Sequence, residues 1–315
     1  MSGHPLHTRL CELLGSPTPI VQTGMGWVAT PELVAGACNA GAFGFLAVAA
    51  LPLPEVEARI EKTLQLTSKP FGVNFLMDAP GAEEIVEMIL RHSVRAAGYN
   101  RAPSAALIDR LKAAGVLCIP TCGAPRHVVK AAKLGADAVI IQGGEGGGHT
   151  GTIPTSLGVP AAARAVDIPV IAAGGFKDGR GLVAALALGA AGIAMGTRFL
   201  MTAESPVPES TADRYARAGL TDVIVTSEID GMPQRVVRNE LVHELESKGP
   251  LGRLIFAARI GLAFRKATGA SLGELLRSAL AMQENEGLTR SQLLMAANAP
   301  MLAKRAMNEG DPVGG

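Results

Sequence analysis

The sequence predicts an α/β fold, a closed (β/α)8 or TIM barrel over residues 1–205, followed by a mainly helical appendage over residues 206–315. Eight short apolar runs recur in the first two-thirds of the chain, as expected for parallel strands covered on both faces. Amphipathic helical patterns separate them, at spacings of roughly 20–30 residues. A doubly wound open sheet is the alternative, but eight repeats favour the barrel.

The expected elements can be placed in order along the chain. Several of the expected helices end in Ala-Gly or Leu-Gly, and the first begins with Pro, which matches the usual chemistry of helix starts and stops. The strands are expected at 19–25, 43–50, 71–76, 94–99, 116–122, 138–144, 168–175 and 191–198. The helices between them are expected at 31–41, 53–66, 82–92, 104–115, 125–135 and 178–189.

The alternation of strand and helix patterns ends after Ser205. A short strand-like piece, DVIVTSEIDG at 222–231, is followed by patterns that predict several helices up to Asn308. We expect this appendage to pack beside the barrel mouth, the end where the strands finish. The last residues, EGDPVGG at 309–315, are rich in turn formers and read as an interruption of a longer fold.

Composition excludes several classes of protein. Of the 315 residues, 48% are hydrophobic and 18% charged, which is typical of a globular chain and not of a disordered one. A net charge of +1 gives no electrostatic reason to expect nucleic acid or a membrane as partner. The N-terminus lacks the apolar core of a signal peptide. The longest uncharged run, between Arg180 and Arg198, is shorter than the ~20 residues of a membrane span. We expect a soluble, cytoplasmic protein.

The four cysteines are Cys11, Cys38, Cys118 and Cys122. Without a secretory signal, disulfides are not expected. The Cys118–Cys122 spacing lacks a second cysteine pair or a nearby histidine cluster, so no zinc site is predicted. Buried, inert thiols are the expectation for these side chains.

Chemistry in such a barrel occurs where strands end. Most residues at these positions are polar or glycine, which suits a ligand that approaches the backbone. They lie at 22–26, Asn74, Tyr99, Thr121, 142–149, 174–177 and 196–198.

The loops after the last two strands predict a phosphate site at Gly174, Gly175, Gly196 and Thr197. Glycine-rich turns that open a helix expose backbone N–H groups, and these loops are the common phosphate site of the fold. The alternative is that the glycines only close turns. The charges of Lys177 and Arg198 could neutralise a phosphate, although Arg198 could equally pair with a carboxylate.

The stretch IIQGGEGGGHTG, residues 140–151, places His149 at the mouth. A histidine exchanges protons near neutral pH, so His149 is the candidate catalytic residue, against the alternative of a purely structural hydrogen bond. Glu145 either orients His149 or caps a backbone turn. The G-x-G-x-x-G match at 146–151 is not a dinucleotide fingerprint, because no acidic residue ends the next strand. Trp27 either lines the pocket or covers the barrel end.

Together these segments resemble the nitronate monooxygenase family, formerly called 2-nitropropane dioxygenase. The family includes flavin-dependent enoyl-acyl carrier protein reductases and related NAD(P)H-dependent reductases of acyl thioesters. The resemblance covers nearly the whole chain, in order. It rests on QTGMGWVA (22–29), PFGVN (70–74), QGGEGGGHTG (142–151), IAAGGFKDGRG (171–181) and MGTRF (195–199).

The resemblance implies FMN at the mouth of a (β/α)8 barrel. Gly24 and Met25 would lie along the isoalloxazine, Asn74 and Gln142 would hydrogen-bond the cofactor, and Gly148 would approach it with its backbone. The phosphate would lie at Gly174, Gly175, Gly196 and Thr197, in agreement with the site predicted from the loops. His149 would match the family's active-site histidine.

The resemblance also implies a redox activity on a small-molecule substrate. It does not decide whether the protein forms a homodimer. The leading expectation is oxidation of alkyl nitronates with O2. The alternative is NADH- or NADPH-dependent reduction of an enoyl or keto acyl-CoA or acyl-carrier-protein substrate. A sugar-phosphate isomerase without flavin and a flavin-binding protein without turnover are further alternatives.

Two departures from the family pattern stand out. The family usually has alanine where this chain has Gly146. It also continues past the Gly-Asp-Pro of residues 310–312 into a glycine-rich segment near the flavin. This sequence ends at Gly315, so that contact is either missing or not included in it.

Overall fold

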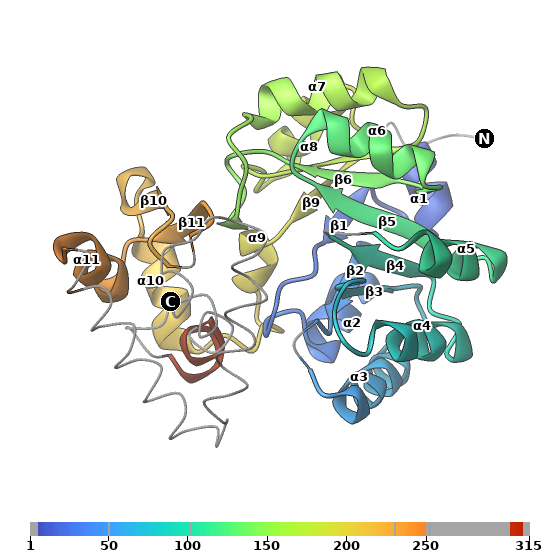
Figure 1. Cartoon of the computed structure of the whole chain (residues 1–315), viewed down its shortest axis with the longest axis horizontal. Helices are drawn as coiled ribbons and strands as arrows, with labels where there is room; N and C mark the ends of the chain where they lie inside the picture. Colours follow the sequence, from blue (N-terminus) through green and yellow to red (C-terminus); the bar gives the residue numbers. More distant parts are fainter. Residues whose placement is uncertain are drawn as a thin grey trace. The chain divides into compact units, whose positions relative to one another are not determined.

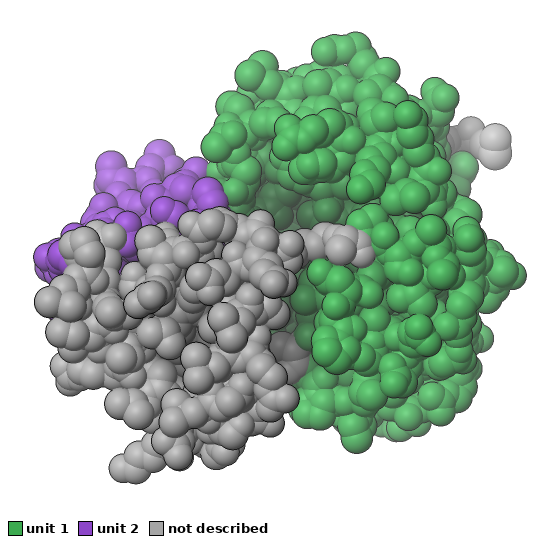
Figure 2. All heavy atoms as spheres, in the orientation of Figure 1, with its two compact units in different colours: residues 1–206 green, residues 207–315 purple. Residues whose placement is uncertain are grey.

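A computed structural model describes residues 6–49, 51–100, 103–229, 231–249, 252 and 303–310. The chain divides into two compact units, residues 1–206 and residues 207–315 (Figure 2). The first unit contains a closed barrel of parallel strands in the order β1-β2-β3-β4-β5-β6-β8-β9, surrounded by helices (Figure 1). The (β/α)8 barrel predicted from the sequence is confirmed.

Each of the expected strands is present, shorter by a few residues than its apolar run. The barrel closes because β9 pairs with β1, with Val21 opposite Ala194. The strands are β1 (Ile20–Gln22), β2 (Phe43–Ala47), β3 (Gly72–Phe75), β4 (Ala96–Tyr99), β5 (Leu117–Cys122), β6 (Val139–Gln142), β8 (Val170–Ala173) and β9 (Gly192–Met195). A two-residue strand, β7 (Gly148–His149), lies in the loop after β6.

The predicted helices are also present. In four of them the glycine that follows has the left-handed backbone expected of a helix stop: φ is +93° at Gly41, +75° at Gly115, +92° at Gly135 and +93° at Gly189. The helices of this unit are α1 (Arg9–Leu14), α2 (Pro31–Asn39), α3 (Leu53–Leu66), α4 (Ala82–Arg91), α5 (Ala105–Ala113), α6 (Pro125–Lys133), α7 (Thr155–Ala165), α8 (Gly179–Ala187) and α9 (Thr197–Leu200).

Helix α7 has no counterpart among the predicted helices. Its interior contains Gly158 and Pro160, which have the lowest helix propensities. Val159 and Ala162 are nevertheless fully buried in the core between the helices and the barrel. Tertiary packing therefore stabilises a helix that local propensity disfavours.

The barrel interior is filled by few large side chains and by glycines that make room for them. The rings of Phe43 and Phe45 on β2 pack edge to face, with centroids 5.3 Å apart. A Cβ atom on Gly72 would lie 2.4 Å from Cε1 of Phe45, and one on Gly98 would lie 2.9 Å from it. The small residues of β3 and β4 are thus what allows an aromatic core in a chain with 3% aromatic residues.

The second unit contains an antiparallel pair of strands and short helices. Strand β10 (Val223–Thr226) lies within the predicted strand-like piece and pairs with β11 (Gln234–Val237). The helices are α10 (Glu209–Arg217), α11 (Glu240–Ser247), a 3-10 turn at Leu220–Asp222 and a π-helical turn at Arg305–Glu309. Most of the helices predicted up to Asn308 lie outside the described residues. The position of this unit at the barrel mouth stays a prediction.

Among the residues that the structure describes, no helix has the length and apolar character to cross a membrane.

The N-terminus of α8 provides a pH-dependent stabilising contact. Asp178 caps the helix by accepting from the backbone N–H of Arg180 at 3.0 Å, and its carboxylate pairs with the Arg180 guanidinium at 2.6 Å. The hydrogen bond from the Arg180 side chain, helped by the backbone N–H groups, lowers the pKa of Asp178 to about 2. The folded pKa is below the unfolded value of about 3.9, so the stabilisation is complete above that value and is lost as pH falls towards 2.

Asp178→Ala is therefore expected to lower the melting temperature at neutral pH. The difference from wild type should shrink below about pH 4, as the wild-type carboxylate becomes protonated. Thermal unfolding of both proteins across the acid range measures this. A difference that does not change with pH would show that the charge of Asp178 contributes nothing.

Candidate functional site

The mouth of the barrel brings together the site residues that were predicted from the sequence. Asn74 lies in β3, and Gln142 is the last residue of β6. The other predicted site residues follow a strand end: Gly24 and Met25 after β1, Gly148 and His149 after β6, Gly174 and Gly175 after β8, and Gly196 and Thr197 after β9. All of them lie at the carboxyl ends of parallel strands, where active sites of this fold occur.

On the β1–β3 side, Asn74 is held between two glycines. A Cβ atom on Gly24 would lie 2.6 Å from Cβ and 2.8 Å from Oδ1 of Asn74, and one on Gly98 would lie 3.1 Å from Nδ2. No described residue forms a hydrogen bond with the half-buried Asn74 amide. Gly24 is thus required for the close approach, and the amide remains available to a ligand.

Gln22, at the end of β1, is a feature that sequence reasoning placed at the mouth without a role. Its side chain is completely buried. Nε2 donates to the carbonyls of Thr23 and Phe45, the latter at 3.4 Å, whereas Oε1 has no partner among the described residues. A buried acceptor without a donor is costly. A Cβ atom on Gly44 would lie 3.0 Å from this oxygen and 3.0 Å from Cγ1 of Val34 in α2, so the oxygen lies on the α2 side of the barrel wall. The signal in the sequence was a polar residue closing the apolar run PIVQ.

The loop after β6, residues 143–151, is fixed from the strand that precedes it. Nε2 of Gln142 donates to the carbonyl of His149 at 2.8 Å and lies 3.4 Å from that of Gly147. Gly148 has φ of +70°, which favours glycine. His149 lies in β7 and is an exposed residue.

Glu145 caps helix α7, one of the two roles left open by the sequence. Its Oε2 accepts from the backbone N–H of Thr155 at 2.9 Å and from the Thr155 hydroxyl at 2.6 Å. Thr155 is the first residue of α7 and is buried. A carboxylate at a helix N-terminus is favoured by the unpaired N–H groups and the helix dipole. The glutamate therefore ties the loop to the helix.

The two glycines after β8 contact this same loop. Gly174 and Gly175 have φ of +101° and +81°. A Cβ atom on Gly174 would lie 2.9 Å from the backbone nitrogen of Gly146, and one on Gly175 would lie 3.4 Å from Cβ of Glu145. They allow the loop to pack closely as well as close a turn, a reason for glycine that sequence reasoning did not identify.

After β9, Gly196 lies against the β1 segment, since a Cβ atom there would be 3.3 Å from Sδ of Met25. Thr197 begins the four-residue helix α9 and is exposed. Lys177 and Arg198 are also exposed, and neither forms an ion pair with the described part of the chain. The positive charges of Lys177 and Arg198 are therefore not neutralised by neighbouring carboxylates.

Tyr99 and Trp27 were the two aromatic residues considered for the mouth. Tyr99 was placed at the mouth from the sequence, but the structure buries it in the core between the strands and the outer helices, and burial raises its pKa. Trp27 has φ of +65°, a strained backbone for a bulky residue, and is half-buried. The structure does not assign Trp27 to either of its two proposed roles.

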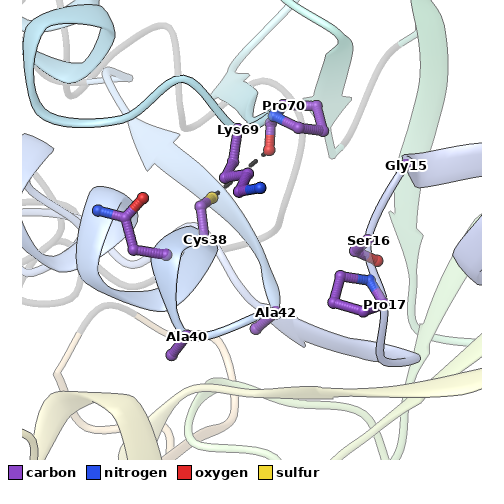
Figure 3. A pocket seen from close by; sticks show the side chains of 10 residues that line it. Gly15, Ser16, Pro17, Cys38, Ala40, Ala42, Lys69 and Pro70 are labelled. Atoms are coloured by element: carbon purple, nitrogen blue, oxygen red, sulfur yellow. Dashed lines mark hydrogen bonds between the residues drawn. The ribbon is translucent and has the colours of Figure 1, made fainter.

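The cysteines form no hydrogen bond with the predicted site residues among the described contacts. A hollow of about 290 Å³ at the opposite end of the barrel is lined by the helix–strand loops and by Cys38 and Lys69 (Figure 3). The Cys38 thiol donates to the carbonyl of Pro70 at 3.5 Å, and burial raises its pKa to about 11. Burial likewise raises the pKa of Cys118 to about 12 and of Cys122 to about 11. All four cysteines are buried and unpaired, as predicted.

Comparison with known proteins agrees with the family resemblance. A family model described as nitronate monooxygenase matches residues 7–101 and 85–304. The chain is 53% identical over 306 residues to (3aS,4S,5R,7aS)-5-hydroxy-7a-methyl-1-oxo-octahydro-1H-indene-4-carboxyl-CoA dehydrogenase of Rhodococcus jostii, covering 97% of this chain and 87% of that protein. It is 31% identical over 283 residues to a probable nitronate monooxygenase of Staphylococcus aureus, covering 75% and 80%.

Among solved structures, FabK from Thermotoga maritima superposes with a TM-score of 0.75 and 32% identity. The alignment covers 98% of this chain and 87% of the FabK chain. The similarity therefore extends over both compact units.

Proposed function

Because the chain belongs to the nitronate monooxygenase family and is an oxidoreductase, we propose that it is an FMN-dependent dehydrogenase of an acyl-CoA thioester. The proposal of a thioester substrate is supported by the 53% identity, over nearly the whole chain, to a protein named for a bicyclic hydroxyacyl-CoA. Membership of this family favours a flavoenzyme over a sugar-phosphate isomerase that uses the same barrel mouth.

The residues at the mouth fit an isoalloxazine ring. The half-buried Asn74 amide has no hydrogen-bond partner among the described residues and would offer the ring both a donor and an acceptor. Gly24 and Gly148 would present backbone to the ring, and the Met25 side chain would lie along it. Gln142 would use its amide oxygen, because its nitrogen already donates within the loop.

The phosphate end fits the loops after β8 and β9. Gly174, Gly175, Gly196 and Thr197 would bind the phosphate through backbone N–H groups and the Thr197 hydroxyl. The exposed cations Lys177 and Arg198 follow the same two strands and would offset its charge.

A bound FMN would supply the two-electron redox chemistry, and a second acceptor such as NAD⁺, NADP⁺ or O2 would be needed to complete turnover. The substrate of the Rhodococcus relative carries a hydroxyl and the thioester carboxyl on adjacent ring carbons. Its oxidation removes one hydride and one proton. A ring nitrogen of His149 would receive the proton, since His149 is exposed at the mouth and its backbone is fixed by Gln142.

The reverse reaction, reduction of a keto thioester with NADH or NADPH, would use the same groups, with His149 donating the proton. Reduction of an enoyl thioester is a separate reaction that would need the same hydride and proton donors. Oxidation of alkyl nitronates with O2 is the second candidate function. The 31% identity to a probable nitronate monooxygenase favours it, at a lower identity and over less of the chain than the dehydrogenase.

Two assays of the FMN-loaded protein with separate substrates distinguish these functions: flavin absorbance under anaerobic conditions, and oxygen uptake in aerated buffer. Loss of the flavin's visible absorbance on adding a bicyclic hydroxyacyl-CoA is the expected result. Bleaching by NADH or NADPH, followed by recovery with an enoyl-CoA, would identify the reductase direction. Oxygen uptake with ethyl nitronate alone would support the second candidate and overturn the first. A protein that does not bind FMN would overturn both.

A further inference from the structure

We propose that Gly146 and the Gln142 side chain act together as a positioning device for His149. The proposal rests on the proposed role of His149. Because residue 146 has no side chain, the Gln142 amide can hold the backbone of the catalytic residue. Gln142 then positions His149 in addition to any contact with the cofactor.

The first observation is the fit between the two residues. A Cβ atom on Gly146 would lie 2.6 Å from Nε2, 2.7 Å from Cγ and 2.9 Å from Cδ of Gln142. Three atoms of one side chain occupy the space that a methyl group would need. Contacts this short do not persist, so Gln142 would have to adopt another rotamer.

The second observation is what the Gln142 amide does in that rotamer. Nε2 donates to the His149 carbonyl at 2.8 Å, seven residues along the chain. This bond links the end of β6, a rigid element, directly to the residue that presents the imidazole. A rotamer change at Gln142 removes the link.

The third observation is that the backbone of residue 146 cannot easily move instead. Gly146 is buried, and its N–H donates to the carbonyl of Gly143 at 3.0 Å. Gly174 packs so closely that a Cβ atom on it would lie 2.9 Å from the Gly146 nitrogen. Gly143 is itself held by its N–H, which donates to the Ala173 carbonyl at 2.9 Å. The side chain of Gln142 is therefore the part that moves.

A double-mutant cycle on the FMN-loaded protein tests the device through turnover. Gly146→Ala is expected to lower kcat by roughly 10- to 100-fold, because a displaced catalytic group loses its orientation. Gln142→Ala should also lower kcat, and the double variant should match Gln142→Ala, since the methyl group then has room. In a His149→Ala background, Gly146→Ala should have no further effect. Additive losses, or an unchanged kcat in Gly146→Ala, would overturn the proposal.

Hydrogen exchange gives a readout that needs no substrate. Peptides covering residues 143–151 should exchange faster in Gly146→Ala and Gln142→Ala. Gly147→Ala is the matched control for the loop, since the nearest atom to its Cβ would be Oγ1 of Thr197 at 3.8 Å, an ordinary contact. If wild type shows no turnover of any thioester, the proposed function fails while the exchange still tests the device. Equal exchange in wild type and Gly146→Ala would contradict it.

Discussion

His149→Ala is expected to lower kcat/KM for acyl-CoA oxidation by roughly 10²- to 10⁴-fold, the usual contribution of a positioned acid–base group. The alanine leaves the Gln142 hydrogen bond in place, because that bond is made by the backbone carbonyl of residue 149. FMN binding and the melting temperature should therefore stay close to wild type. The rate of anaerobic flavin reduction by the hydroxyacyl-CoA, monitored by stopped-flow absorbance, measures this loss of activity.

His243→Ala is the matched control for this substitution. His243 is exposed on α11 and lies far from the barrel loops in sequence, so its replacement by alanine is the same chemical change at a distant position. It should retain full activity. If His149→Ala reduced its flavin as fast as the His243 control, the proton would have another acceptor and His149 would have no catalytic role.

Gly143→Ala is expected to produce the largest structural effect at the mouth. A Cβ atom there would lie 2.1 Å from Oγ1 and 2.6 Å from both the Cα and the backbone nitrogen of Thr155. Backbone atoms cannot rotate away, so α7 or the loop must shift, and the Glu145 cap on Thr155 is disturbed. We expect the free energy of unfolding to fall by about 1–3 kcal/mol and FMN binding to weaken.

Chemical denaturation and flavin titration measure these two effects. Gly179→Ala is the control, because it follows the Asp178 cap at the start of α8 and a Cβ atom there meets nothing within 4 Å. Alanine is a better helix former than glycine, so this control should be neutral or more stable by up to about 1 kcal/mol. If Gly143→Ala unfolded like the Gly179 control, the close packing of the loop on α7 would not exist in solution.

The sequence was sufficient to predict the barrel, because strand and helix periodicity are local properties. Runs such as IPVIAAGG appear as strands in the structure, and the glycines after the helices have the left-handed backbone that the stop signal implies. Since parallel strands end at one face, the order of the strands also predicted which residues meet at the mouth. The chemical roles of those residues stay predictions.

Other features required the three-dimensional packing. Helix α7 forms despite Gly158 and Pro160 because its apolar side is buried, and burial is not visible in local propensity. Tyr99 ends a strand at the mouth, yet alternation along β4 turns it to the outer helices. The choice between the two roles of Glu145 depended on Thr155, ten residues away.

The sequence by itself determined the fold, the family and the position of His149 at the barrel mouth. Only the tertiary structure decided why the mouth contains so many glycines. Gly24, Gly143, Gly146 and Gly174 each leave space for a residue from another segment or for the Gln142 side chain, and at these distances one methyl group would exclude it. Contacts between segments distant along the chain carry no local pattern, so no reading of periodicity could have assigned them.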